Sequence, residues 1–260
     1  MKRKLFVLFL VLTVFYSCSK DEPISSQGGT TVVNKAINRQ TTGSSAHDLL
    51  SDDKFTSMVV ELVYVEGYEP STTTETNFLN FLQQHTYKPS GITVKKRSIP
   101  SPGQEVYTID DIAQIERDNR LYYNSDKTVA VWAYFSDGKS DKDAADGSTV
   151  ILGTAYWNTS YVIYEKTVKS LSGGPFAPSQ SLLESTVIFH EFGHLFGLVN
   201  LGSPMQTDHE DVPNHPHHCT DQSCLMYWAT ESSIGISNIS NTPPDFDSQC
   251  LADIQANGGK

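Results

Sequence analysis

The sequence predicts a mixed α/β domain of the α+β class, with helices packed over a twisted mixed sheet, on three observations. Short runs rich in β-branched and aromatic residues recur along the chain, amphipathic helical segments separate them, and turn residues bound them. Strands that alternate with helices pair in parallel through helical crossovers, and one edge strand can run antiparallel. We therefore expect such a sheet to begin near residue 55.

Three strands and two helices are predicted in the first half of the domain. Residues 58–65 (MVVELVYV) form an apolar run that ends before Gly67 and Pro70, as a buried strand does. Apolar residues at helical spacing predict helices over residues 74–85 and 109–121. Apolar and β-branched runs predict strands over residues 91–99 and 128–135. Residues 149–156 and 161–168 predict two further strands, which we expect to form a hairpin.

The composition is that of a globular protein with an acidic surface. Of 260 residues, 38% are hydrophobic and 19% are charged, which is too apolar for a disordered chain. The net charge is -11 and the isoelectric point is about 5.1, which excludes nucleic acid or an anionic membrane as a partner held by charge. We expect a monomer.

The N-terminus predicts export. Basic residues 2–4 precede the apolar run of residues 5–16, which is too short to cross a bilayer and suits a signal peptide. The run ends at Ser17 and Cys18, which resemble the lipobox of bacterial lipoproteins, in which the Cys is lipidated. The alternative is an ordinary signal peptide with an incidental Cys. We expect residues 1–18 to be a lipoprotein signal peptide, and the lipid on Cys18 to hold the protein at the outer membrane, on the cell surface.

Three parts follow the signal peptide. Residues 19–50 are rich in Ser, Thr, Gly, Asn and Gln and predict a flexible tether. We expect residues 51–198 to form an N-terminal subdomain and residues 199–260 a smaller C-terminal one. Residues 246–257 predict a terminal helix, which a glycine pair ends.

A helix is predicted to begin at Ser181, where Ser181 and Glu184 fit a capping box, and to end at Gly197. His190 and His194 are four residues apart, so both imidazoles lie on one face and reach one metal ion. The intervening Glu191 projects about 100° round the helix, near enough to reach a water molecule on that metal.

These residues form the H-E-x-x-H signature of zinc peptidases. The alternative is a helix with two buried, hydrogen-bonded histidines and a surface glutamate. A catalytic zinc usually takes a third protein ligand. The pattern H-E-x-x-H-x-x-G-x-x-H of the metzincin clan includes Gly197 here, but Asn200 stands where its third histidine is expected.

Residues 218–227 (HCTDQSCLMY) resemble the matrixin segment that runs from the third ligand to the Met-turn, and also the archaemetzincins. This resemblance implies that His218 is the third zinc ligand, that Met226 supports the site from below, and that residues 198–217 are an insertion. His209, inside the insertion, is the alternative third ligand. The implied fold is metzincin-like, with the zinc cleft above the small C-terminal subdomain.

The resemblance implies a zinc-dependent endopeptidase with one catalytic Zn²⁺ and a protein or peptide substrate. Glu191 would act as the general base, and substrate would lie along an edge strand near residues 153–156. Tyr227 and Trp228 are candidates for one wall of a substrate pocket, or ordinary core aromatics. A catalytically inactive surface binding or adhesion protein remains the alternative, because of Asn200 and the long insertion.

Two further site expectations concern ions and cysteines. A calcium ion at Asp208, Glu210 or Asp211 has no supporting loop signature. Besides Cys18, the chain contains Cys219, Cys224 and Cys250, which allow one disulfide and leave one thiol. We expect the bridge to involve Cys224, with its partner left open.

Overall fold

A computed structural model describes residues 33–239 and 241–260 of the chain. The expected signal peptide, the expected lipidation site Cys18 and residues 19–32 of the expected tether lie outside these described residues. Within the described ranges, no helix is long and apolar enough to cross a membrane.

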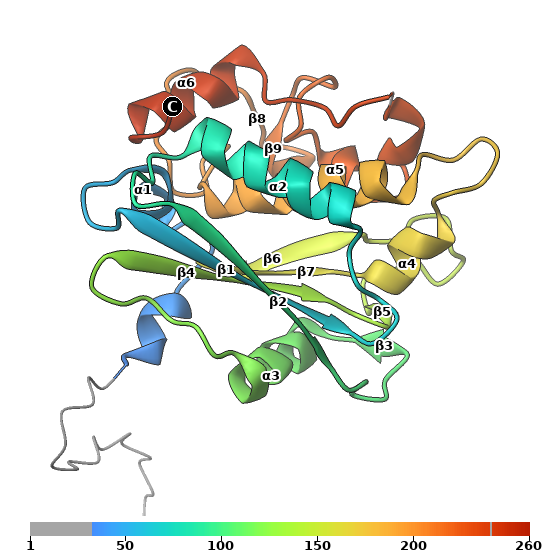
Figure 1. The fold of residues 1–260 in the computed structure, drawn as a ribbon. Coiled ribbons are helices and arrows are strands. Elements are labelled where there is room, and N and C mark those ends of the chain that lie inside the picture. The colour runs from blue at the N-terminus through green and yellow to red at the C-terminus, as the bar shows by residue number, and fades with distance from the viewer. Residues whose placement is uncertain (1–32, 240) are drawn as a thin grey trace, which may run out of the picture. The chain divides into compact units, whose positions relative to one another are not determined.

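A five-stranded mixed sheet forms the centre of the fold (Figure 1). In the order β2-β1-β4-β7-β6, its strands are Ile92–Ile99, Ser57–Val65, Thr128–Phe135, Ser160–Ile163 and Gly153–Trp157. β1 pairs in parallel with β2 and β4, and β4 pairs in parallel with β7. β6 lies antiparallel to β7 at one edge. The predicted class, parallel pairing and antiparallel edge strand are confirmed.

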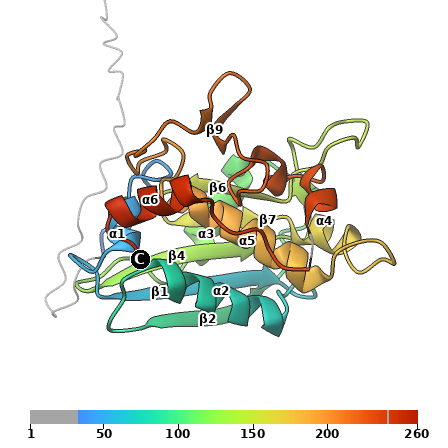
Figure 2. The same ribbon diagram turned by 90° about the horizontal axis from the view of Figure 1, so that it is seen from above.

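Helices cover both faces of this sheet (Figures 1 and 2). α2 (Thr72–His85) and α5 (Gln180–Leu195) lie over one face, and α3 (Ile109–Asn119) lies over the other. The remaining helices are η1 (Lys35–Asn38), α1 (Ala46–Leu50), α4 (Glu165–Ser170), η2 (Trp228–Glu231), η3 (Gly235–Asn238) and α6 (Ser248–Ala256). Short strand pairs are β3 (Val106–Tyr107) with β5 (Lys139–Ser140), and β8 (Glu210–Asp211) with β9 (His215–Cys219).

The central strand β4 divides its side chains between two hydrophobic cores. Val131, Ala133 and Phe135 belong to the core that contains the α2 and α5 side chains. Trp132 and Tyr134 belong to the core against α3. This alternation follows from the two-residue period of a strand. Because both faces are buried, the run reads as continuously apolar in the sequence.

The prediction that residues 19–50 form a flexible tether is wrong for the second half of this stretch, which contains η1 and α1. α1 lies within residues 19–50, and its Leu49 and Leu50 are fully buried in the core. The Asn38 side chain of η1 is also buried and donates to Asn124 Oδ1 at 2.8 Å and to Thr159 Oγ1 at 3.1 Å. The stretch is mostly polar, so its composition gives no sign that these few side chains are buried in the fold.

The strand predicted over residues 161–168 ends at Ile163. Helix α4 begins two residues later, at Glu165. Glu165 in α4 is fully buried, and so is a second carboxylate, that of Glu184. The side chain of Gln180 lies between them. Gln180 Nε2 donates to Glu165 Oε1 at 3.1 Å and to Glu184 Oε1 at 2.6 Å. Burial, reinforced by Glu184, raises the pKa of Glu165 to about 10.

Glu165→Gln is expected to stabilise the fold at pH 8 but not at pH 4. The folded pKa is raised, so the contribution of Glu165 is fully present below its unfolded pKa of 4.5 and is lost as the pH rises toward 10. Gln resembles the protonated side chain and carries no such pH dependence. Thermal melts at both pH values should show a gain of roughly 2–4 kcal/mol at pH 8 alone. Equal melting temperatures at pH 8 would contradict this account.

Candidate metal centres

Helix α5 carries the first two candidate ligands, and it begins earlier than predicted. Its N-cap is Ser179, whose side chain accepts a hydrogen bond from Leu182 N at 3.2 Å, so the capping box predicted at Ser181 is wrong. Glu184 is instead buried against the start of α2, where its carboxylate accepts from Ser71 N at 3.1 Å. Gly197 follows the helix with a φ of 69°, in the left-handed conformation that the sequence predicts.

His190 and His194 face each other from successive turns of α5. Their Nε2 atoms are 3.1 Å apart and both side chains are buried. His190 Nδ1 donates to the carbonyl oxygen of Leu225 at 2.8 Å, which leaves Nε2 as the atom with a free lone pair. Burial and the neighbouring imidazole of His218 lower the pKa of His190 to about 4. The pKa of His194 is likewise well below its ordinary value, chiefly because of burial.

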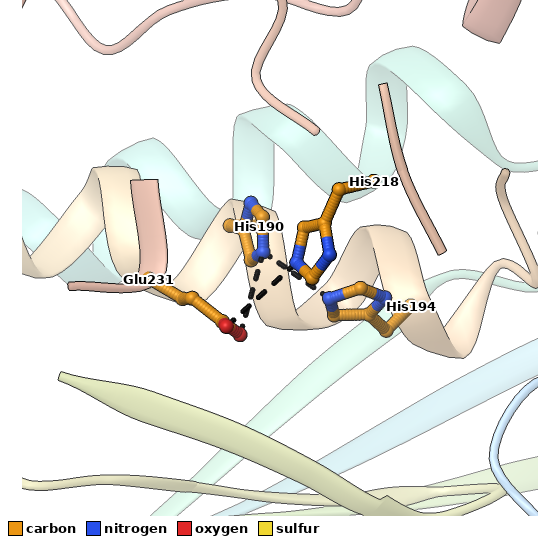
Figure 3. A group of neighbouring side chains, drawn as sticks. All are labelled: His190, His194, His218 and Glu231. Atoms are coloured by element: carbon orange, nitrogen blue, oxygen red, sulfur yellow. Dashed lines mark hydrogen bonds and ion pairs between the residues drawn. The ribbon is translucent and has the colours of Figure 1, made fainter. Parts of the chain in front are cut away.

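The third imidazole comes from β9, far along the chain. Figure 3 shows it beside the other two. The ring of His218 lies 5.3 Å from that of His190 and 5.0 Å from that of His194, centroid to centroid. His218 Nδ1 donates to Pro216 O at 3.0 Å, and its buried Nε2 has no hydrogen-bond partner. The structure thus brings together the three histidines that the sequence singled out.

The insertion over residues 198–217 explains how Asn200 can replace a histidine. Asn200 turns away from the three imidazoles, and its side-chain amide donates to Glu210 Oε2 at 3.0 Å. The chain then forms the β8–β9 hairpin, which carries His218 back to α5. Asp211 pairs with His215 Nδ1 at 2.7 Å, so the acidic residues considered for calcium are partly engaged within the hairpin.

The structure adds Glu231, which sequence reasoning missed, to this cluster. One atom from each of His190, His194, His218 and Glu231 lies within 4.8 Å of the others. Glu231 sits at the end of η2, and no motif in the sequence marks it. The only available signal was a carboxylate five residues after the predicted Met-turn residue, which is too common a feature to interpret.

The residues of this histidine centre fit a tetrahedral zinc ion. Zinc–nitrogen bonds of about 2.0–2.1 Å place two ligand nitrogens roughly 3.3 Å apart. The distance of 3.1 Å between the Nε2 atoms of His190 and His194 agrees with this value. The buried Nε2 of His218 has no hydrogen-bond partner, which suits a metal ligand, because buried polar atoms are otherwise hydrogen-bonded.

Glu191 lies beside the histidine centre and under the edge strand. Its carboxylate is fully buried, and both oxygens lack a hydrogen-bond partner. A side chain at Gly153, the first residue of β6, would come within 2.7 Å of Glu191 Oε1, so the strand passes close over the carboxylate. Burial and the nearby charge of Glu231 raise the pKa of Glu191 well above its ordinary value, as suits a proton acceptor.

Met226 supports α5 from below at the level of Gly193. Met226 is fully buried, and a Cβ atom at position 193 would overlap its sulfur atom. The preceding Leu225 carbonyl is the acceptor that orients His190. Met226 is therefore a packing support in this structure, with glycine required at position 193.

A second group of side chains lies on the other side of β9. His209, Cys219, Asp247 and Cys250 each place one ligand atom within 4.8 Å of the others. Adjacent residues of a strand point to opposite sides, so His218 faces the histidine centre and Cys219 faces this second group. Cys224 lies beside this group, with its Sγ atom 3.7 Å from that of Cys250. We call the set His209, Cys219, Cys224 and Cys250 the cysteine centre.

The geometry of the cysteine centre fits zinc better than a disulfide. All three cysteines in the described part of the chain are free thiols, so the expected bridge to Cys224 is absent there. The Sγ atoms of Cys224 and Cys250 are 3.7 Å apart. Zinc–sulfur bonds of about 2.3 Å predict roughly 3.8 Å for that distance, whereas a disulfide needs about 2.05 Å.

His209 belongs to the cysteine centre and not to the histidine centre. Its Nδ1 lies 3.4 Å from Cys219 Sγ and 4.0 Å from Cys250 Sγ. Its Nε2 lies 3.0 Å from Asp253 Oδ2, the carboxylate–histidine arrangement that typically orients a metal ligand. The geometry therefore places the alternative third ligand in a different cluster.

The two aromatic residues after Met226 lie in different surroundings. Tyr227 lines a pocket of about 380 Å³ together with residues such as Thr230 and Pro243. Trp228 stacks on His215, with ring centroids 4.1 Å apart and an interplanar angle of 3°. Tyr227 thus borders this cavity, whereas Trp228 packs on a residue of the β8–β9 hairpin.

The chain matches no protein-family model and no curated protein. Among solved structures, it is similar to archaemetzincin from Methanopyrus kandleri, with 17% identity, a TM-score of 0.51, and coverage of 78% of this chain and 96% of that one. It is also similar to a zinc-dependent peptidase from Methanocorpusculum labreanum (14% identity, TM-score 0.48, coverage 75% and 99%). A third similar structure is metalloproteinase-II from Bacteroides fragilis (15% identity, TM-score 0.41, coverage 79% and 55%). The mixed sheet with its helices thus has the archaemetzincin-like fold that the sequence predicts.

Proposed function

We propose that the protein is a zinc-dependent endopeptidase of the metzincin type. The observation that carries the proposal is the convergence of His190, His194 and His218 beside the buried, partnerless carboxylate of Glu191. The fold shared with archaemetzincin supports it.

The three histidines would hold the catalytic zinc ion through their Nε2 atoms. Bound there, zinc would polarise a peptide carbonyl and lower the pKa of a water molecule to near neutrality. Glu191 would accept the proton of the attacking water and deliver it to the leaving amine. Its raised pKa allows it to hold that proton between the two transfers.

Strand β6 would bind the substrate in an extended conformation. Among the described residues, β6 pairs only with β7, so its outer edge offers backbone donors and acceptors to a peptide. Gly153 brings this strand directly over Glu191. A peptide added along β6 would therefore pass close to the catalytic carboxylate, and Tyr227 would border the pocket for one of its side chains.

The cysteine centre would hold a second, structural zinc ion. His209, Cys219, Cys224 and Cys250 supply four ligands, which is the number that closes a structural zinc site. Asp247 would stay outside the coordination as the N-cap of α6, where its side chain accepts from Cys250 N at 2.8 Å. Strand β9 would then be fixed at Cys219, one residue from the catalytic ligand His218.

The alternative of an inactive binding protein loses its main support. It rested on Asn200 and on the long insertion, and in our proposal the hairpin within that insertion brings His218 to the site in place of Asn200. A site without turnover also has no need for a buried carboxylate beside the histidines. We keep lipidation at Cys18 and attachment to the outer surface of the cell as part of the proposal; mass analysis of the mature N-terminus tests it.

Zinc content of the purified protein tests the ligand assignment. We expect two zinc ions per wild-type chain. His218→Ala should lose only the histidine-centre ion, and His209→Ala only the cysteine-centre ion. Loss of hydrolysis should accompany the first change, with each variant checked by circular dichroism. Loss of catalytic zinc in His209→Ala with retention in His218→Ala would reverse the assignment.

A further inference from the structure

Glu231 faces the histidine centre with both of its carboxylate oxygens. Oε2 lies 3.8 Å from His190 Nε2, and Oε1 lies 3.8 Å from His218 Nε2. Figure 3 shows the carboxylate pointing toward the imidazoles, across the space where their nitrogens converge. The proposed peptidase mechanism assigns no role to this side chain.

Backbone pairing holds Glu231 in this position. Its carbonyl oxygen accepts a hydrogen bond from Leu152 N at 2.8 Å, and Ser233 N donates to Val150 O at 3.0 Å. These bonds join the end of η2 to the residues that lead directly into β6. The carboxylate therefore projects from a fixed backbone, although its side chain is 29% exposed.

The negative charge of Glu231 is not balanced by a permanently charged side chain among the described residues. In the described part of the chain, its ion-pair partners are His190 and His218, with no lysine or arginine among them. A second carboxylate, Glu191, is buried close by. Three imidazoles and the Glu231 carboxylate face one small space, and a divalent ion at its centre would stabilise this arrangement strongly.

We propose that Glu231 is the fourth protein ligand of the histidine centre in the substrate-free protein, and that it closes the site until a peptide binds. The inference rests on the proposed function. Zinc sites with four protein ligands are closed, whereas catalytic sites keep one position open, so Glu231 must leave for hydrolysis to proceed.

Two features identify Glu231 as the ligand that can leave the metal: the exposure of its side chain and the backbone pairing of its segment. Its side chain is 29% exposed, against 12% for His218 and 0% for His190. Since its backbone is paired to residues just before β6, a peptide that adds to β6 contacts the same segment and can displace the carboxylate.

The test is metal binding by Glu231→Gln, compared with the wild type and with Glu191→Gln as a matched carboxylate control. Zinc affinity of the histidine centre is measured by chelator competition. Co²⁺, added to protein whose cysteine centre already holds zinc, reports the ligand set by its visible spectrum. Azide reports whether a coordination position is open.

We expect Glu231→Gln to bind zinc about 10–100-fold more weakly, to shift the Co²⁺ spectrum, and to bind azide where the wild type does not. At saturating zinc it should still hydrolyse peptides. Glu191→Gln should keep the wild-type affinity and spectrum but lose hydrolysis.

Three results would overturn the inference: an unchanged zinc affinity in Glu231→Gln, azide binding by the wild type, or loss of hydrolysis in Glu231→Gln at saturating zinc. The first two leave the proposed peptidase function intact and remove only the closing role of Glu231. A wild-type histidine centre that binds neither zinc nor Co²⁺ would instead contradict the proposed function itself.

Discussion

Glu191→Gln should lower peptide hydrolysis by about 10²–10⁴-fold while the zinc content stays at the wild-type value. Gln keeps the shape of the side chain but cannot accept the proton of the attacking water. The carboxylate is buried and its oxygens accept no hydrogen bond of normal geometry, so the substitution acts chiefly on the capacity to accept a proton. Initial rates on an unfolded protein substrate, with zinc measured on the same samples, provide the comparison.

Glu66→Gln is the control for this change, because Glu66 is an exposed carboxylate in the loop after β1. It should retain wild-type rates. Hydrolysis at an undiminished rate by Glu191→Gln would remove Glu191 as the general base. A parallel loss of zinc would instead make it part of the metal site.

Cys250→Ser is expected to abolish binding of the second zinc ion and to lower the melting temperature by roughly 10 °C or more. A structural zinc ion contributes its binding free energy to folding, and this one would join β9, the segment before Met226 and α6. Cys224 lies two residues before Met226, whose neighbour Leu225 orients His190. The histidine centre should therefore also bind zinc more weakly.

Thermal melts with and without a chelator check this prediction, and thiol counting on the denatured protein distinguishes zinc from a disulfide. Chelation should lower the melting temperature of the wild type much more than that of Cys250→Ser. Equal melting temperatures for the two proteins, or a Cys224–Cys250 disulfide in the native protein, would contradict the structural zinc site.

Much of the fold follows from local periodicity. The strands over residues 58–65 and 128–135 are buried on both faces, and their largely apolar runs predict them within one residue of the observed ends. The strand predicted over residues 161–168 fails where Glu165 is buried by tertiary contacts. The predicted capping box fails for a related reason, since Glu184 binds Ser71 of another helix instead of its own N-terminus.

The first half of the metal site is also local. Helical spacing alone predicts that His190 and His194 share a face, and the structure confirms that they do. The position of His218 could be predicted only from its resemblance to the segment before a Met-turn. Glu231 and the partnership of His209 with Cys250 depend on how distant segments pack, which no local pattern records.

Removal and return of zinc tests the central claim most directly. Purified protein is stripped with a chelator, and cleavage of an unfolded protein is followed as zinc is added back. We predict that cleavage stops after chelation and returns when the histidine centre is refilled, with no recovery in Glu191→Gln. Cleavage that persists in the stripped protein, or a zinc-loaded wild type that cleaves no peptide bond, would contradict the proposed function.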